Sequence, residues 1–287
     1  MSGISIVIPV LNDGAHLLRT LPAIAAEAAT RNLPVEVIVV DNGSSDDTVE
    51  VAAKLGARVL LEHRNLGTPY SARNRGIEAS SGDVVVLLDA TCVPRPGWLA
   101  AGLSALGERG GIIGGRVRFS FEGERPTASE AYDAMVHVQM EEAITIHRRA
   151  MTANLFISRD VFARRGLFRE GVRSGEDVRW TSDAARAGER LDYCHEAAVS
   201  KPARTRADLL DKVRRTARGA PAFLGRRNSV LAVVKGLLTP PDPRNVLGLL
   251  RRHFPDDAAA MFVPVFLVAW RLRWARATAM LSALIRR

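Results

Sequence analysis

Cysteine is scarce in this chain of 287 residues, with only Cys92 and Cys194 present. Two cysteines cannot build a disulfide framework or a thiolate zinc site, and so few of them suit a reducing compartment. The six histidines are scattered, with no pair four residues apart and no HExxH pattern, so none is assigned to a metal. Disulfide scaffolds and zinc metalloproteases are therefore excluded.

The chain also lacks the glycine patterns of common nucleotide-binding classes. No G-x-x-x-x-G-K-[ST] loop occurs, and no G-x-G-x-x-G follows the first apolar run. P-loop nucleotidases and dinucleotide dehydrogenases are therefore poor interpretations. The residues after Met1 show no basic segment followed by a long apolar run, so we expect no secretory signal peptide and a cytoplasmic location.

Acidic residues are few in the last third of the chain. The whole chain has 40 Lys and Arg against 31 Asp and Glu, a net charge of +9. From Lys201 to Arg287 there are 18 basic and 5 acidic residues, a net charge of +13, which leaves residues 1–200 at −4. Nucleic acid, an anionic membrane surface or an acidic substrate could each explain such a basic tail.

Residues 1–204 show the pattern of an α/β domain. Short apolar runs alternate with helical segments, and the expected strands are 4–10, 35–40, 58–62 and 83–89. Strands that alternate with helices form a parallel sheet with helices on both faces. Ligands of such sheets bind beyond the carboxyl ends of the strands, and Asp41 and Asp89 stand at two of those ends.

Five stretches, in this order and spacing, resemble a family 2 glycosyltransferase with the GT-A fold. They are SIVIPVLNDG (5–14), VEVIVVDNGSSDDT (35–48), NLGTPYSARNRGIEASSGDVVVLLDA (65–90), MTANLFISRDVFARRGLF (151–168) and GEDVRWTSDAARAG (175–188), followed by VSKPAR (199–204). The resemblance implies a GT-A catalytic domain over residues 1–204. Such an enzyme moves a sugar from a nucleotide-diphosphate donor to a saccharide or lipid-linked acceptor, with inversion. The alternative is a catalytically degenerate protein that binds nucleotide-sugars or acts as a scaffold.

The resemblance assigns the donor pocket to the first three stretches. Asp41 would accept a hydrogen bond from the base, which favours UDP, and Pro9 and Val10 would form the apolar wall against that base. Arg73 would reach Asp41 or a phosphate, where a planar guanidinium suits anionic oxygens. Asn12 is grouped with these donor-binding residues, although it also suits a helix cap.

The family's metal site is altered at two positions. Where the family reads Asp-x-Asp, this chain has Asp89-Ala90-Thr91, so a hydroxyl replaces a carboxylate ligand of Mg²⁺ or Mn²⁺. Where the family reads Val-x-His-Pro, Lys201 stands at the histidine position. Three interpretations stay open: Lys201 neutralises the diphosphate in place of a metal, Asp89 and the diphosphate still hold the metal, or the domain is inactive.

Glu176 and Asp177 are the expected catalytic carboxylates. Inverting transfer needs a base that takes the proton of the acceptor hydroxyl, and a carboxylate in the first turn of a helix stays ionised. The resemblance makes Asp177 the base and leaves Glu176 to contact the acceptor or the backbone. Trp180 and Asn154 are the acceptor-side candidates, with core packing as the alternative for Trp180 and a structural role as the alternative for Asn154.

Residues 205–287 are predicted to be helical, basic and amphipathic. Residues 258–270 are free of charge, but 13 residues are fewer than the roughly 20 that a spanning helix needs. Tryptophans and arginines then alternate: Trp270, Arg271, Arg273, Trp274 and Arg276. This pattern is typical of an interfacial anchor, so we expect peripheral association with the anionic inner face of the cell membrane. A helical subdomain packed on the catalytic core is the alternative. Nucleic-acid binding is not favoured, since no recognised binding module accompanies the basic residues.

Overall fold

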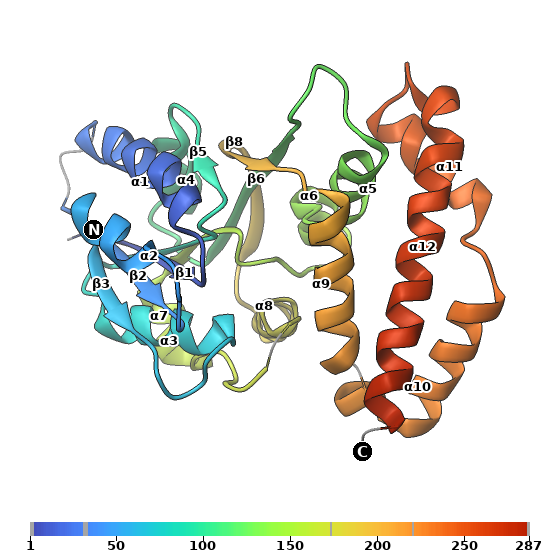
Figure 1. Cartoon of the computed structure of the whole chain (residues 1–287). Coiled ribbons are helices and arrows are strands. Elements are labelled where there is room, and N and C mark those ends of the chain that lie inside the picture. The colour runs from blue at the N-terminus through green and yellow to red at the C-terminus, as the bar shows by residue number, and fades with distance from the viewer. Residues whose placement is uncertain (1–2, 31–33, 173, 220, 286–287) are drawn as a thin grey trace. The chain divides into compact units, whose positions relative to one another are not determined.

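The computed structural model describes residues 3–30, 34–172, 174–219 and 221–285 (Figure 1). Its contacts divide the chain into two compact units. Unit 1 comprises residues 1–118 and 138–201, and unit 2 comprises residues 119–137 and 202–287. The chain therefore leaves unit 1 twice. The catalytic domain expected from the sequence, residues 1–204, includes the segment 119–137. In the structure this segment packs with the C-terminal helices.

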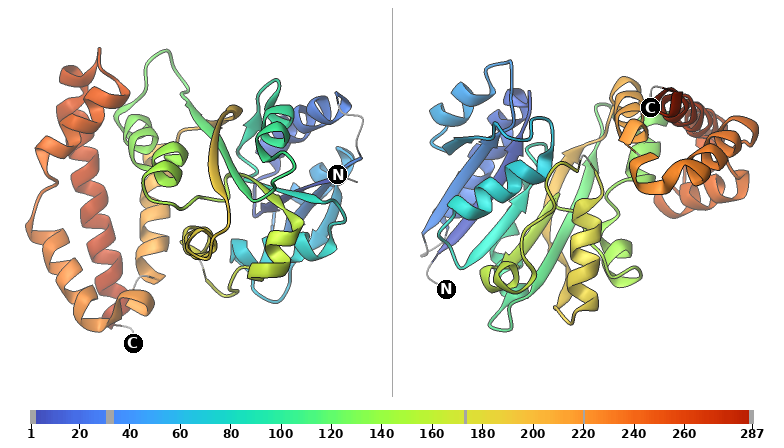
Figure 2. Two further views of the ribbon diagram at one scale, coloured as in Figure 1. Left: turned by 180° about the vertical axis from the view of Figure 1, so that it is seen from behind. Right: turned by 90° about the horizontal axis from the view of Figure 1, so that it is seen from below.

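One mixed sheet of eight strands forms the centre of unit 1 (Figure 2). Its strands are β1 (Ile4–Val10), β2 (Val35–Asp41), β3 (Arg58–Leu61), β4 (Val84–Leu88), β5 (Val93–Pro94), β6 (Ile112–Ser120), β7 (Asn154–Ser158) and β8 (Leu191–Pro202). Their order across the sheet is β3-β2-β1-β4-β7-β6-β8-β5. The first four strands pair in parallel, as the apolar runs predicted, while β7 runs antiparallel to β4 and β5 antiparallel to β8.

Helices cover both faces of this sheet. They are α1 (Gly14–Ala29), α2 (Thr48–Lys54), α3 (Pro69–Ala79), α4 (Trp98–Leu106), α6 (Met140–Thr145), α7 (Arg159–Arg165) and α8 (Glu176–Arg186). One hydrophobic core joins the sheet to α1, α2 and α4, and a second joins it to α3, α6, α7 and α8. The predicted α/β class is therefore confirmed.

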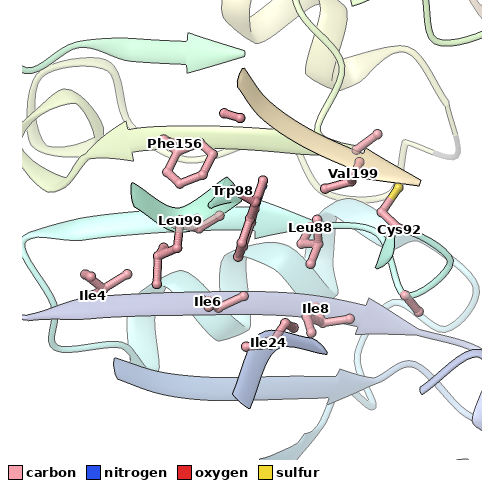
Figure 3. Close-up of a cluster of buried hydrophobic side chains, with 14 of the residues drawn as sticks. Ile4, Ile6, Ile8, Ile24, Leu88, Cys92, Trp98, Leu99, Phe156 and Val199 are labelled. Carbon is pink, nitrogen blue, oxygen red and sulfur yellow. The ribbon is translucent and has the colours of Figure 1, made fainter. Parts of the chain in front are cut away.

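Strand β4 shows why the central strands are apolar throughout. Val84, Val86 and Leu88 point into the first core, while Val85 and Leu87 point into the second. Side chains alternate between the faces of a sheet. In a strand covered on both faces every side chain is therefore buried, and all of them are apolar. Figure 3 shows the first core, with Leu88 among side chains of neighbouring strands.

Unit 2 is built from helices. They are α5 (Ala128–Val136), α9 (Arg206–Gly219), α10 (Pro221–Leu238), α11 (Pro243–His253) and α12 (Ala258–Ile285). The long helix α12 packs against α5, α9, α10 and α11 and buries Val265, Ala269 and Leu272. Gly225, with a φ of 72°, interrupts α10. The basic C-terminal region is therefore helical, as predicted.

A buried carboxylate ties α5 to the start of the C-terminal helices. Asp133 is fully buried and accepts hydrogen bonds from the backbone N–H of Arg204 (2.9 Å) and from its guanidinium (3.0 Å). His137, one turn further along α5, places Nδ1 2.7 Å from the same carboxylate. Burial opposes ionisation of Asp133, but His137 and Arg204 outweigh it and hold the pKa of this carboxyl well below its ordinary value.

Helix α12 also exposes apolar residues along one side. Among the described residues it is the one helix whose length and composition would suit a membrane span, although a core helix of a soluble protein can pass the same test. The exposed residues follow one another at intervals of three or four positions, with one interval of seven, so they lie on one side of the helix. They define the apolar stripe: Val263, Leu267, Trp270, Trp274, Leu281 and Ile285.

Candidate active site

Three strands of unit 1 end at the same edge of the sheet. The register pairs Val10 at the end of β1 with Asp41 at the end of β2, and Asp89 directly follows β4. Because parallel strands present their carboxyl ends together, the predicted donor-binding residues share one edge. Pro9 and Val10 lie beside Val40 and Asp41 there.

Asp41 organises the loop that follows β2. Its carboxylate is 5% exposed and accepts hydrogen bonds from the backbone N–H groups of Gly43 and Ser44, both at 3.1 Å. Asn12, in the left-handed region with a φ of 52°, accepts a hydrogen bond from the N–H of Ser45 and donates its own N–H to the Ser44 hydroxyl. The two loops beside the predicted base pocket are thus tied together, and Asn12 contributes to that tie.

Arg73, Asp89 and Lys201 form one ionic cluster. Arg73, 5% exposed on α3, donates from a terminal nitrogen to Asp89 Oδ1 at 2.8 Å. The Lys201 ammonium, whose residue is 3% exposed, lies 3.3 Å from Asp89 Oδ2 and donates to the Thr91 hydroxyl. The Asp89 side chain is 32% exposed, so it is the part of the cluster that solvent reaches.

The pairing of β5 with β8 delivers Lys201 to this cluster. Val93 pairs with Ser200 and Pro94 with Val199 in an antiparallel register. Lys201, the next residue of β8, therefore lies beside the residues that precede β5, although more than 100 residues of sequence separate them. Lys201 accordingly also lies 3.8 Å from the Cys92 sulfur, and burial, although partly opposed by that ammonium, raises the pKa of the Cys92 thiol to about 11.

These residues do not fit a divalent cation. No group of three or more His, Cys, Asp or Glu side chains that could hold a metal occurs within residues 3–30, 34–172, 174–219 and 221–285. Asp89 is already bonded to a guanidinium and to an ammonium, and the Thr91 hydroxyl is bonded to the same ammonium. Mg²⁺ and Mn²⁺ need several oxygen ligands, and a fixed ammonium at this position repels them.

Asp177 lies in the first turn of α8 and is fixed by residues of two other segments. Tyr70 on α3 donates its hydroxyl hydrogen to Asp177 Oδ1 at 2.8 Å, and the Thr152 N–H donates to Oδ2 at 3.2 Å. Gly175, with a φ of 85°, permits the turn that begins the helix. Burial, and then the Asp177 charge, raise the pKa of Tyr70 well above its ordinary value, so the phenol stays a hydrogen-bond donor.

Glu176 has a different environment from its neighbour. It is 3% exposed and accepts hydrogen bonds from the backbone N–H of Arg169 at 2.9 Å and from Arg179 Nε at 2.7 Å. Burial opposes its ionisation, but these bonds outweigh burial and lower the pKa of Glu176. Its carboxylate holds the loop before α8, which leaves Asp177 as the more accessible of the two acids.

The two acceptor-side candidates lie inside the fold. Trp180 is 3% exposed, packs between the rings of Phe162 and Phe168, and donates its indole N–H to a backbone carbonyl. Asn154 is fully buried and bonds Trp98 and two backbone carbonyls. Neither side chain has a face for a sugar, so both are core residues and we do not propose them further as acceptor contacts.

Two residues of the site are absent from the sequence-based set. Tyr70 precedes Arg73 by three positions on α3, and its ring centroid lies 5.6 Å from the Arg73 guanidinium. Thr152 precedes β7 and hydrogen-bonds Asp177. The three-residue spacing of Tyr70 and Arg73 signals a shared helix face, but no sequence signal connects Thr152 with a carboxylate 25 positions away.

Comparisons with known proteins identify the family of the chain. The model of Glycosyl transferase family 2 matches residues 5–171. Glycosyltransferase AglE of Haloferax volcanii is 35% identical over 297 residues, which cover 99% of this chain and 96% of that protein. Among solved structures, a mannosyltransferase from Pyrobaculum calidifontis in complex with GDP-Man and Mn²⁺ covers 99% of this chain and 86% of its own (TM-score 0.56, 16% identity). Glucosyl-3-phosphoglycerate synthase from Mycobacterium tuberculosis, in complex with Mg²⁺ and UDP, covers 77% and 79% (TM-score 0.52, 22% identity). At these identities the two structures show a common fold.

Proposed function

The chain belongs to glycosyl transferase family 2, and from this premise we propose that it transfers a sugar from UDP to a saccharide or lipid-linked acceptor with inversion at the anomeric carbon. One observation carries the proposal. A continuous series of contacts runs from Asp177 through Tyr70, Arg73 and Asp89 to Lys201. A carboxylate able to accept a proton and a cationic cluster able to hold a diphosphate therefore belong to one site.

Asp177 is the base of the proposed reaction. The acceptor oxygen attacks the anomeric carbon while Asp177 takes its proton, and the bond from that carbon to the diphosphate breaks. A single displacement of this kind inverts the configuration at the anomeric carbon. The hydrogen bonds from Tyr70 and Thr152 fix the carboxylate without protonating it, because both donors stay neutral.

Asp41 is the proposed contact for the nucleobase of the sugar donor. Its buried carboxylate already accepts two backbone N–H groups, and each carboxylate offers about four acceptor positions, so a uracil N–H can still be accommodated. Pro9 and Val10, at the carboxyl end of β1, supply apolar surface beside it. A carboxylate there accepts a hydrogen bond from the N–H of a pyrimidine base, which favours UDP-sugars.

A donor screen tests this function. We expect release of UDP from a UDP-sugar in the presence of acceptor glycans or polyprenyl phosphates, with GDP- and dTDP-sugars as comparisons. The Asp41→Asn variant should raise KM for the donor by roughly 10-fold, the worth of one hydrogen bond to a charged group, with kcat changed less. Turnover of GDP-sugars alone would contradict the assignment of Asp41 to a uracil, and no turnover of any donor would contradict the function.

The apolar stripe of α12 is proposed to lie on a membrane. Trp270 and Trp274 are 39% and 49% exposed. Together with Leu267 and Arg271 they form one open surface of α12. Tryptophan and arginine side by side suit the boundary between lipid headgroups and acyl chains. The cytoplasmic leaflet is anionic, so the net charge of +13 from Lys201 onward favours peripheral binding at that face.

Vesicle co-sedimentation tests the membrane proposal. We expect the full chain to pellet with vesicles that contain phosphatidylglycerol and to remain in solution with pure phosphatidylcholine. Arg271→Gln should weaken binding roughly 5-fold, because each basic residue near an anionic surface contributes about 1 kcal/mol. The matched control is Arg109→Gln in unit 1, which should change nothing. Equal binding to neutral vesicles, or equal loss in the control, would reject the proposal.

A further inference from the structure

We infer that Lys201 takes the place of a divalent metal ion: its ammonium, together with Arg73, binds the donor diphosphate and neutralises the charge of the leaving nucleoside diphosphate. The inference rests on the proposed transfer reaction and specifies how this chain carries it out. It is drawn from the ionic cluster at the carboxyl edge of the sheet, from an unpartnered nitrogen within it, and from the poor fit of that edge to a metal.

The reaction creates a negative charge that something must neutralise. As the acceptor oxygen bonds to the anomeric carbon, the bond from that carbon to the β-phosphate oxygen breaks. The electron pair of the broken bond stays on the nucleoside diphosphate, and the acceptor proton passes to Asp177. The leaving group therefore gains one negative charge, and a cation beside the β-phosphate stabilises the transition state more than the ground state.

The cluster carries an excess of positive charge in a buried place. Arg73 and Lys201 contribute two formal positive charges and Asp89 one negative, a sum of +1. Both cationic residues are at most 5% exposed. Two buried cations that share the Asp89 carboxylate attract an anion such as a diphosphate.

One nitrogen of the cluster lacks a partner. In the described part of the chain, the buried Nε of Arg73 has no hydrogen-bond acceptor. A buried donor left in this state costs about 1–3 kcal/mol, and native structures satisfy the great majority of such groups. Phosphate oxygens are strong acceptors for a guanidinium, so a bound diphosphate would supply what this nitrogen lacks.

The ammonium is also bonded to the side chains that a metal ion would need as ligands. Lys201 is bonded to Asp89 and to Thr91, the two oxygen-bearing side chains that follow β4. Two like charges a few ångströms apart repel strongly where water is scarce. A metal could enter only if the ammonium left both partners. The pairing of β5 with β8 holds the backbone of Lys201 beside Asp89 and Thr91.

Chelation is the first test. We expect wild-type turnover of the accepted donor to be the same in excess EDTA as in Mn²⁺. Lys201→Met, which keeps the length of the side chain, should lower kcat by about 10²–10³-fold, as removal of one transition-state donor does elsewhere. Lys54→Met, on the exposed surface of α2, is the matched control and should keep full activity.

Binding of inorganic pyrophosphate is the second test and needs no turnover. By calorimetry without metal, we expect the wild type and Lys54→Met to bind pyrophosphate and Lys201→Met to bind it at least tenfold more weakly. Thermal unfolding of each variant shows whether the fold is kept. A further variant, Thr91→Asp with Lys201→His, should bind Mn²⁺ detectably by electron paramagnetic resonance, whereas the wild type should not.

The outcomes separate this inference from the proposed function. If the wild type turns over a donor only with Mn²⁺, or if a well-folded Lys201→Met variant binds pyrophosphate as the wild type does, the inference is overturned while the function stands. If no donor is turned over under any condition, the function fails, and the pyrophosphate titration still decides whether Lys201 binds a diphosphate.

Discussion

Asp177→Asn is expected to lower kcat for sugar transfer by about 10²–10⁴-fold, the usual contribution of a general base. The amide has nearly the same shape, and its oxygen can still accept the hydrogen bond from Tyr70, but its NH₂ group cannot accept the bond from the Thr152 N–H. The amide cannot take a proton from the acceptor hydroxyl. Steady-state kinetics should therefore show a loss in kcat, while calorimetric affinity for the nucleoside diphosphate stays within a few fold of the wild type.

Asp183→Asn is the matched control for this experiment. Asp183 lies on the same helix, about two turns from Asp177, and its exposed carboxylate pairs with Arg179 and Arg186 on the surface. This substitution should leave kcat unchanged. Full activity of Asp177→Asn would reject Asp177 as the base, and an equal loss in both variants would point to damage to α8 rather than to lost proton transfer.

Asp133→Ala is expected to destabilise unit 2 by about 3–5 kcal/mol, because removing one partner of a buried ion pair leaves the other charge uncompensated. The guanidinium of Arg204 would lose its carboxylate, and so would His137. Chemical denaturation followed by far-ultraviolet circular dichroism measures the effect. The control is Asp211→Ala, an 80% exposed residue of α9 whose pair with Arg214 is 3.7 Å long, with an expected change below about 0.5 kcal/mol.

The pH dependence of this effect has a defined sign. The pKa of Asp133 is lower in the folded chain than in the unfolded chain, where it is about 3.9. Its contribution is therefore complete above that value and is lost as the pH falls through the folded pKa. Below about pH 4, where Asp133 of the unfolded chain becomes protonated, the difference between the wild type and Asp133→Ala should shrink. A difference that grows below that pH would contradict the assignment.

The sheet could be predicted because its signal is local. The runs that became β1 to β4 are short, apolar and separated by turn residues, and burial on both faces follows from the sequence alone. The polar ends at Asp41 and Asp89 follow from the same runs. The position of segment 119–137 in unit 2 could not be predicted, because α5 owes its place to contacts with α11 and α12 more than 100 residues away.

The side-chain environments were harder to predict than the site itself. Asp177 and Glu176 are neighbours with the same charge, yet Glu176 is buried by Arg179 and the Arg169 backbone while Asp177 keeps some exposure. Trp180 could face a sugar or the core by its spacing alone, since a helix position does not reveal what packs against it. Only the rings of Phe162 and Phe168 decide this, and they come from another segment.

The pairing of β5 with β8 makes the charge of the site depend on backbone register. β5 has two residues and lies at the end of the sheet, where a strand has one neighbour. A shift of one residue in a strand moves every side chain to the opposite face. One inserted or deleted residue near Val93 or Ser200 would therefore turn Lys201 away from Asp89 without changing a single functional group. The charge of the site therefore depends on the number of residues in β5 and β8 as well as on the presence of the lysine.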